Sequence, residues 1–194
     1  MQEEAPTRLR IIAAAYACVA CVGIAATTLD AAAQEAAVSR ATVYRYFPGG
    51  RDELVSATVA WEVARFFEGL REDVGEAPDF ATYLERGLLA AHRRLATHEV
   101  LQQVLEDEAD RLIPPLASVM HHVVSVLRDD FGRRLEKEAL RPGVDPAEAA
   151  DLLARMMLSF MGTPGSWDLD DPFAVHRLVR DWLLAGVLPS EADG

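Results

Sequence analysis

The sequence is short of cysteine. Its 194 residues include two, Cys18 and Cys21, which form an isolated C-x-x-C. No second cysteine pair follows and no histidine lies nearby in the sequence, so the spacing of a zinc site is missing. A thioredoxin-like site would need a preceding strand, and none is predicted. On a helix the two positions share a face, which favours two small core residues over a redox pair.

Aromatic residues are also few, at 7 % of the chain, and isoleucine, a strand-favouring β-branched residue, is scarce. Alanine, leucine, valine, arginine and glutamate dominate instead, and this composition favours helices. The chain is 51 % apolar and 26 % charged, which suits a soluble globular protein with one large or two small domains. No internal repeat and no low-complexity tract interrupts it.

Several motifs of catalysis and metal binding are missing. The sequence has no nucleophile elbow, no phosphate-binding glycine loop and no H-E-x-x-H. The histidines are scattered, and the adjacent pair His121 and His122 faces different sides of a helix, which is poor geometry for a shared metal ion. We therefore predict a protein that is not an enzyme, with no catalytic residue, no metal site and no cofactor.

Positive charge is in short supply, because the formal net charge is −12 and the sequence pI is about 4.8. That total alone argues against a nucleic-acid partner, since DNA binding depends on basic side chains at phosphates. The distribution is more informative. Residues 1–60 carry five arginines and six acidic residues, so nearly all of the excess acid lies in the rest of the chain. That acidity would keep the C-terminal part away from DNA.

A run without charge, Ile11–Leu29, follows Arg8 and Arg10 and resembles a signal peptide or a short membrane span. Its richness in alanine, glycine and threonine makes it a poor membrane segment, and two acidic residues precede it. We favour a tightly packed core helix. The alternative is an exported helical protein with residues 1–33 as its signal.

Apolar periodicity and capping signals predict helices throughout the chain. Thr27 with Asp30 resembles a weak capping box for the second helix, and Ser39 is a good N-cap for the third. Leu116–Leu127 has the clearest amphipathic pattern. The predicted helices are residues 7–22, 29–36, 40–47, 51–73, 80–96, 99–113, 116 to about 140, 146–161 and 172–187. We therefore expect an all-α fold.

An ordered set of short motifs lies in the first quarter of the chain. Thr27-Thr28 opens the second helix, Ala36–Ser39 forms a tight turn, Arg40–Phe47 reads R-A-T-V-Y-R-Y-F, and Arg51 opens the fourth helix. Over about residues 7–55 this set resembles the TetR family signature. The resemblance implies a three-helix, helix-turn-helix DNA-binding domain at residues 1–53 and a larger C-terminal helical domain at residues 54–194, for ligand binding and dimerisation.

The physical chemistry of the motif agrees with that resemblance. Two short helices joined by a tight turn let the second enter the major groove. Arg40, in its first turn, can take guanine O6 and N7 in a bidentate contact, and the phenols of Tyr44 and Tyr46 can donate to phosphates. Val38, Val43 and Phe47 are better interpreted as the core beneath. The predicted DNA-binding residues are Thr28, Ser39, Arg40, Thr42, Tyr44, Arg45, Tyr46 and Arg51.

Some positions depart from the family pattern. Ala37 stands where the turn usually has glycine, and Ala32 where a large aliphatic residue is usual. Asp30 and Glu35 bring acid near the DNA face, and Gly49-Gly50 adds one residue before the fourth helix. These departures bear on affinity and on the choice of operator.

The C-terminal half supplies apolar material for the effector pocket and dimer that the resemblance implies. Candidate pocket residues are Trp61, Phe66, His92, Leu105, Met120, Val124, Met156, Phe160 and Trp167, although aromatic residues and methionines at helical spacing are more often plain core. Because Leu152–Met161 is apolar nearly all round, that helix is predicted to face a partner. Candidate interface residues are Leu153, Met157, Met161, Leu178 and Trp182.

The sequence thus favours a cytoplasmic, ligand-responsive transcriptional regulator that binds double-stranded DNA. We expect a homodimeric repressor on a near-palindromic operator, released by a small, mainly apolar effector and without a membrane partner. Two alternatives stay open. One is the exported protein named above, and the other is a helical ligand-binding or enzymatic protein whose DNA-binding domain is vestigial.

Overall fold

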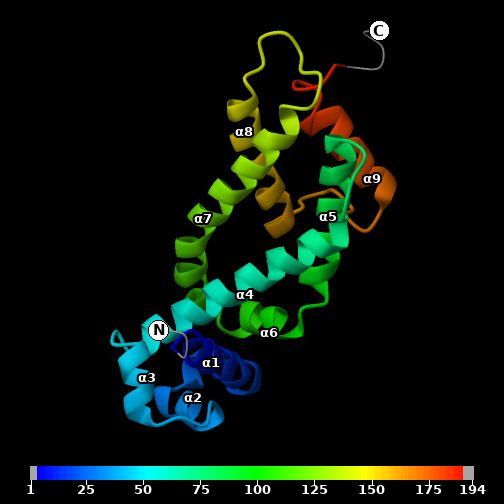
Figure 1. The fold of residues 1–194 in the computed structure, drawn as a ribbon. Coiled ribbons are helices and arrows are strands. Elements are labelled where there is room, and N and C mark those ends of the chain that lie inside the picture. The colour runs from blue at the N-terminus through cyan, green and yellow to red at the C-terminus, as the bar shows by residue number, and fades with distance from the viewer. Residues whose placement is uncertain (1–3, 190–194) are drawn as a thin grey trace. The chain divides into compact units, whose positions relative to one another are not determined.

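The structure is a computed structural model that describes residues 4–189 (Figure 1). Those residues form helices and loops without any strand, which confirms the all-α prediction. The helices are α1 (Glu4–Ala26), α2 (Leu29–Glu35), α3 (Arg40–Tyr46), α4 (Arg51–Val74), α5 (Phe80–Ala96), α6 (Glu99–Asp107), α7 (Ala109–Leu135), α8 (Pro146–Gly162) and α9 (Pro172–Arg177), followed by a π-helical segment η1 (Leu178–Leu183).

The chain divides into two compact units that do not follow chain order. Unit 1 holds the residues up to Phe66 together with His98–Val119, and unit 2 holds Phe67–Thr97 and the residues from Met120 onward. The expected division after residue 53 differs, because α6 and the start of α7 pack with the N-terminal helices. Buried Ile24, Val55 and Val104 share one apolar cluster there, and burial of such side chains is the main favourable term in folding.

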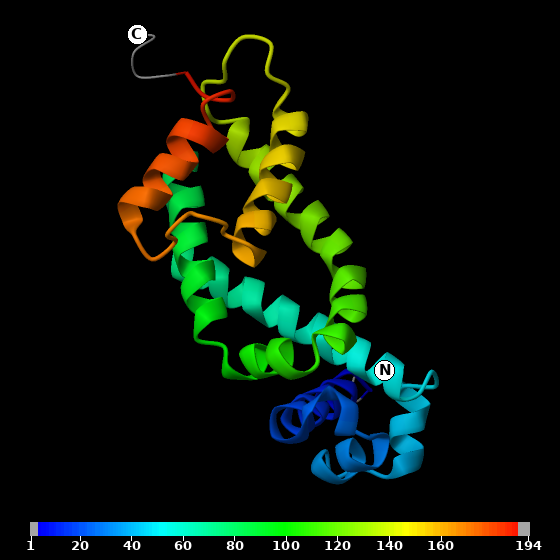
Figure 2. The same cartoon turned by 180° about the vertical axis from the view of Figure 1, so that it is seen from behind.

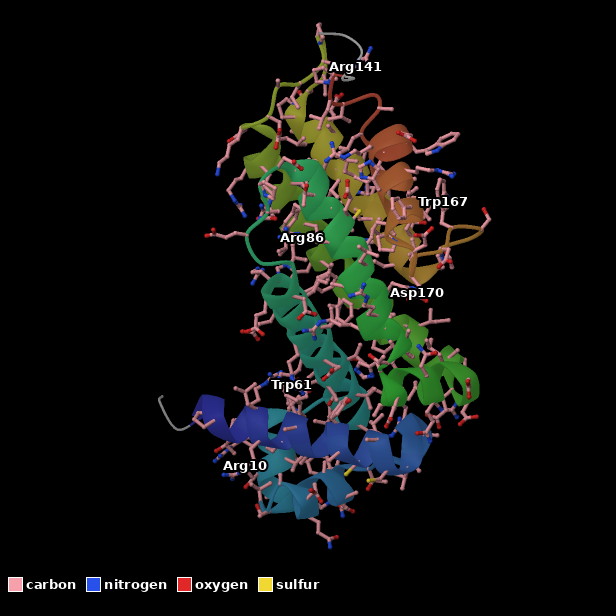
Figure 3. All side chains as sticks on the ribbon, turned by 90° about the vertical axis from the view of Figure 1, so that its right-hand side faces the viewer. Arg10, Trp61, Arg86, Arg141, Trp167 and Asp170 are labelled. Carbon is pink, nitrogen blue, oxygen red and sulfur yellow. The ribbon has the colours of Figure 1, made fainter. Side chains whose placement is uncertain are left out.

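The N-terminal helices enclose a small core of their own. Ile11 and Ile12 of α1 are buried in one cluster with Val43 of α3 and with Phe47, which follows α3, and the cluster includes alanines of α2. Figure 3 shows Trp61 of α4 beside α1, where its ring meets Tyr16 edge to face at 5.9 Å between centroids. Alanine at these positions lets α1 and α2 approach closely, so a thin helix pair still buries its apolar face.

Helix α1 is the uncharged run of the sequence. By length and composition, Pro6–Ala26 is apolar enough to cross a membrane, and a third of that window is buried in the fold. Ile11, Ile12 and Ala15 are fully or almost fully buried, so this run supplies the core of unit 1. That packing favours the core-helix interpretation over the signal-peptide alternative, because one face of the helix is buried against its own domain.

The two cysteines are not core residues, so that interpretation was wrong. Cys21 is exposed and Cys18 is half-buried, and both thiols are free. Burial raises the pKa of the Cys18 thiol, and Glu35 and Cys21 raise it further. A raised pKa lowers the fraction of reactive Cys18 thiolate at neutral pH.

Two helix boundaries differ from the sequence prediction. The predicted helix 99–113 breaks at Glu108 instead of at Pro114-Pro115, and both prolines lie inside α7. Glu108 has φ and ψ of −143° and 31°, which are neither helical nor extended, so the helix breaks between α6 and α7. The predicted helix 172–187 is shorter, and it becomes α9 followed by the wider π-helical segment η1.

Unit 2 packs α5, the end of α7, α8, α9 and η1 around a larger apolar core. Figure 2 shows α9, in orange, beside α5, in green, within this unit. Leu84 and Leu88 of α5 are fully buried, as are Val175 and Val179 near the C-terminal end. Asp145 and Asp171 cap α8 and α9, each followed by proline in the first turn, where the missing N–H is harmless.

A polar network braces α5 against α7 within unit 2. The Tyr83 hydroxyl donates to Asp130 Oδ2 at 3.0 Å, and Arg134 Nε donates to the same oxygen at 3.0 Å. Burial pushes the pKa of Asp130 upward, but the hydrogen bond and charge of Arg134 and the Tyr83 hydrogen bond outweigh it, so this pKa lies below its ordinary value. The carboxylate form of Asp130 therefore stabilises the fold.

Candidate nucleic-acid interface

Helices α2 and α3 form a helix-turn-helix in unit 1 (Figure 1). Thr28 caps α2, since its Oγ1 accepts from Ala31 N at 3.1 Å, and Ser39 caps α3, since its Oγ accepts from Thr42 N at 3.1 Å. Each cap satisfies one of the N–H groups that a helix start leaves free. The predicted cap of α2 was one residue early, because Thr27 is buried and its hydroxyl donates back to Gly23 O at 2.7 Å.

The turn between the two helices depends on Ala37. Its φ is 51°, the one positive φ outside glycine in the described part of the chain. A left-handed alanine costs about 1–2 kcal/mol. With alanine at the position where glycine is usual, the turn keeps a left-handed residue and carries that strain.

Beneath the two helices lies the core that was predicted for this motif. Val43 and Phe47 are fully buried, and Val38 packs against them. Because these residues occupy the inner face of α3, its polar residues are directed outward. Ser39, Arg40, Tyr44 and Arg45 are all exposed, and Tyr44 exposes 44 % of its surface although its ring is large. Exposed aromatic and cationic side chains on one short helix form a surface for a polar, anionic partner.

A known protein family matches the segment that carries this surface. The family described as bacterial regulatory proteins, tetR family, matches the chain over residues 11–58. That range holds α2, the turn, α3 and the first residues of α4. Over this N-terminal range the chain is similar to the TetR family. The α2–turn–α3 segment lies inside the matched range, so the helix-turn-helix is the part of the chain that resembles this family.

Several solved structures share the fold over nearly the whole chain. The R. erythropolis transcriptional repressor QsdR is 19 % identical, covers 97 % of this chain and 98 % of its own, and has a TM-score of 0.63. Salmonella enterica GusR is 23 % identical, with coverages of 95 % and 97 % and a TM-score of 0.62. SmeT in its triclosan complex is 23 % identical, with coverages of 96 % and 93 % and a TM-score of 0.58. A search of curated sequences gives no match.

On the surface of the helix-turn-helix, Arg40 is paired with an acid. Its Nε lies 2.9 Å from Asp30 Oδ1 of α2, and its guanidinium carbon lies 5.6 Å from the centre of the Tyr44 ring. Both members of the ion pair are more than half exposed, so the pair is weak and opens easily. Asp30 of α2 and Arg40 of α3 are thus neighbours on the outer face of the helix-turn-helix.

The other predicted contact residues are divided between exposed and half-buried positions. Arg45 is exposed, and its guanidinium carbon stands 5.0 Å from the centre of the Tyr46 ring. Tyr46 and Thr42 are half-buried, and the Thr42 hydroxyl lies 2.8 Å from Ser39 Oγ. The side chains of Ser39 and Thr42 thus begin in a local hydrogen bond that DNA would have to replace.

Arg51 differs from the other predicted contacts, because its donors face the protein backbone. Its Nε donates to Thr27 O at 2.8 Å, and its Nη2 donates to Ile24 O and, at 3.3 Å, to Ala25 O. Nη1 lies 3.5 Å from Asp52 Oδ1. A phosphate contact by Arg51 stays a prediction, whereas its structural role in holding the segment before α2 is plain in the geometry.

The candidate pocket residues do not fall in one unit. Trp61, Phe66 and Leu105 belong to unit 1, and Leu105 is 43 % exposed. The others, His92, Met120, Val124, Met156, Phe160 and Trp167, belong to unit 2. Figure 3 places Trp167 and Asp170 on the loop between α8 and α9, and His92 Nε2 lies 3.5 Å from Asp170 Oδ2. Phe160 and Trp167 pack against the core of unit 2, so an effector cavity there stays a prediction.

The candidate interface residues are mostly interior. Leu153, Met157 and Leu178 are almost fully buried in the core of unit 2, so they offer no surface to a partner. Met161 is half-buried, and Trp182 is 71 % exposed. The sequence pattern chose the inner stripe of α8, because a helix that is apolar nearly all round does not reveal which side faces its own core.

Sequence reasoning also missed Glu108. Its carboxylate, 83 and 84 residues away in the chain, accepts hydrogen bonds from Ala25 N and Ile24 N. No local signal marks this residue, since it lies within an acidic stretch that reads as continuous helix. Only the helix break between α6 and α7 could have drawn attention to it.

Proposed function

We propose that this chain is a ligand-responsive, DNA-binding transcriptional repressor that acts as a homodimer in the cytoplasm. The observation that carries the proposal is the outer face of α3, where Ser39, Arg40, Tyr44 and Arg45 are exposed above a fully buried apolar stripe. The family match over the same segment supports it. A short, capped helix with a polar outer face is the element that enters a major groove.

Each exposed residue has a chemical role in this proposal. Arg40 leaves Asp30 and makes a bidentate contact to guanine, which gives base specificity. Tyr44 donates its phenol to a phosphate, and Arg45 adds a cationic phosphate contact at the other end of α3. Thr28 stands at the N-terminus of α2 and presents a further hydroxyl to the backbone of DNA.

A homodimer is supported by large apolar side chains that unit 2 leaves in solvent. Leu152 and Met156 lie one turn apart on α8 and are 58 % and 36 % exposed, while Phe173 of α9 and Trp182 of η1 are 81 % and 71 % exposed. Burying one such side chain is worth about 1.5–3 kcal/mol. We therefore place the partner on the Leu152–Met156 side of α8 and on α9 and η1, instead of on the inner stripe.

The effector is proposed to bind unit 2. SmeT, which has a similar fold, has a solved structure in complex with triclosan. That complex motivates the proposal of a small-molecule effector for this chain. Half-buried Met120, Val124 and Phe160 are suitable apolar lining. Release of DNA requires the effector to prefer the conformation that does not bind DNA, since tight binding alone shifts no equilibrium.

Selection of bound sequences from random DNA tests the proposal. The wild type is expected to enrich an inverted repeat, as a symmetric dimer would, and Arg40→Ala/Tyr44→Ala is expected to lose it. Arg111→Ala/Tyr16→Phe is the control: its charge change matches, and Arg111 is exposed on α7 outside the helix-turn-helix. Absence of enrichment at low salt, from folded wild type, would overturn the DNA-binding role.

A further inference from the structure

The last turn of α1 is separated from the rest of the helix at Gly23. Gly23 has φ 81° and ψ 171°, so the helical hydrogen bonds stop there and begin again afterwards. The segment that follows, Ile24–Thr27, is a short helical turn that leads directly to Thr28, the N-cap of α2. We call Ile24–Thr27 the hinge turn, because it joins α1 to the helix-turn-helix.

A carboxylate from elsewhere in unit 1 caps the start of the hinge turn. Glu108 Oε2 accepts from Ile24 N at 2.5 Å, and both of its oxygens accept from Ala25 N at 3.1 Å. These are the N–H groups that a new helix start leaves without partners. A negative charge at that end is also favoured by the dipole of the turn.

A guanidinium holds the other end of the same turn. Arg51 Nε donates to Thr27 O at 2.8 Å, and its Nη2 donates to the carbonyl oxygens of Ile24 and Ala25. Opposite charges therefore bracket the hinge turn at the ends where its dipole favours them. Hydrogen bonds to charged groups contribute about twice as much as neutral ones.

The close approach of Glu108 also explains why residue 23 is glycine. A Cβ added to Gly23 would lie 3.0 Å from Glu108 Oε1, and the positive φ is itself unfavourable for other residues. Any side chain here would push the carboxylate away from the N–H groups of the hinge turn. Glycine at position 23 thus permits the bend in the backbone and leaves room for the Glu108 carboxylate.

Glu108 lies between α6 and α7. Its own N–H donates to Val104 O at 2.8 Å, and its carbonyl accepts from Arg111 N at 2.9 Å, so the residue is fixed to both helices. Ile24, Val104 and Leu112 are buried together beside it. The position of the hinge turn is consequently tied to the α6–α7 junction through one carboxylate and a small apolar contact.

We infer that Glu108 is a positioning residue for DNA binding, which orients α2 and α3 by holding the N–H end of the hinge turn. This inference rests on the proposed function. Displacing the carboxylate frees Ile24 N and Ala25 N, and the helix-turn-helix then loses its fixed orientation to α6 and α7 within unit 1. The residue acts through the hinge turn and does not itself approach DNA.

The test is the substitution Glu108→Gln, compared with Glu106→Gln and Asp107→Asn. All three remove one negative charge, and both control side chains are exposed. Less negative charge should tighten binding to a polyanion, so the controls should bind the selected DNA as well as or better than wild type. Glu108→Gln should bind about tenfold more weakly, because the amide can accept one of these hydrogen bonds but presents N–H groups to the other.

Hydrogen exchange supplies a readout that needs no DNA. In Glu108→Gln the amides of Ile24 and Ala25 should exchange at least about tenfold faster, while the buried amides of α3 stay protected. Glu108→Asp keeps the charge on a shorter stem and should fall between the two. That variant also keeps the inference testable if Glu108→Gln does not fold at the assay temperature.

The outcomes separate the inference from the proposed function. Glu108→Gln that binds DNA as tightly as Glu106→Gln, or unchanged exchange at Ile24 and Ala25, would overturn the positioning role while leaving the DNA-binding role intact. Wild type that binds no DNA would overturn the proposed function, and with it the positioning role, whatever the exchange rates show. Weaker binding with faster exchange at those two amides, in Glu108→Gln alone, supports the inference.

Discussion

Asp30 is predicted to weaken DNA binding, although it is close to the residue that should read the bases. Its Oδ1 lies 2.9 Å from Arg40 Nε in the free protein. To reach a base edge Arg40 has to leave this partner, and Asp30 would then face the phosphates. Asp30→Asn removes the negative charge that competes with DNA for Arg40, and it also removes the repulsion between Asp30 and the phosphates. The asparagine side chain has the same shape as that of aspartate.

The magnitude follows from the exposure of the pair. The side chains of Arg40 and Asp30 are 64 % and 58 % exposed, and pairs of this kind contribute about 0.2–1 kcal/mol. Releasing Arg40 should therefore tighten binding about 1.4- to 5-fold per recognition helix. Stability should move the other way by about 0.3–1 kcal/mol, because Asp30 lies in the first turn of α2, where the helix dipole favours an acid.

Fluorescence anisotropy with the selected DNA measures this effect, and Glu35→Gln is the control. Glu35 is exposed at the far end of α2 and carries the same charge. If Asp30→Asn and Glu35→Gln tighten binding equally, the gain is general electrostatics and not the release of Arg40. A double substitution, Asp30→Asn/Arg40→Ala, should bind no better than Arg40→Ala alone. Weaker binding by Asp30→Asn would refute the reasoning.

Three further predictions follow from the fold. Ala37→Gly relieves a left-handed alanine, and after the entropy of glycine is subtracted the unfolding free energy should rise by about 0.5–1 kcal/mol in a denaturant titration. Leu152→Glu with Trp182→Glu should shift the protein from dimer to monomer by sizing, whereas Ile113→Glu, equally exposed in unit 1, should not. Asp130→Asn should lower the unfolding free energy by about 1–3 kcal/mol at pH 7. Because the pKa of Asp130 is depressed, that difference should persist above the ordinary carboxyl pKa of about 4 and vanish as pH falls through the lowered value.

The helix-turn-helix could be predicted because its signals are local. Ser39 caps α3, Val43 and Phe47 face inward, and Arg40 and Tyr44 face outward, all within one short stretch. Periodicity and capping act over three or four residues, so a sequence records them directly. The family match over residues 11–58 lies in the same stretch.

Features that depend on distant contacts could not be predicted in this way. The break at Glu108 is held by the hinge turn, more than 80 residues earlier, while the local sequence reads as unbroken helix. Arg51 was assigned to phosphates on its place in the motif, and its actual acceptors are the carbonyls of that same turn. On α8 both faces are apolar, so only packing shows that Leu153 is inside and Leu152 outside.

The most direct measurement of the central claim is the salt dependence of DNA binding. Anisotropy titrations of the selected inverted repeat at several salt concentrations would compare wild type with Arg45→Gln and with the control Arg111→Gln. We predict that the logarithm of the affinity falls linearly with the logarithm of the salt concentration. The magnitude of that slope should be smaller in Arg45→Gln by about one per recognition helix, and it should be unchanged in Arg111→Gln. Binding that ignores salt, or equal slopes in all three proteins, would contradict a phosphate contact through α3.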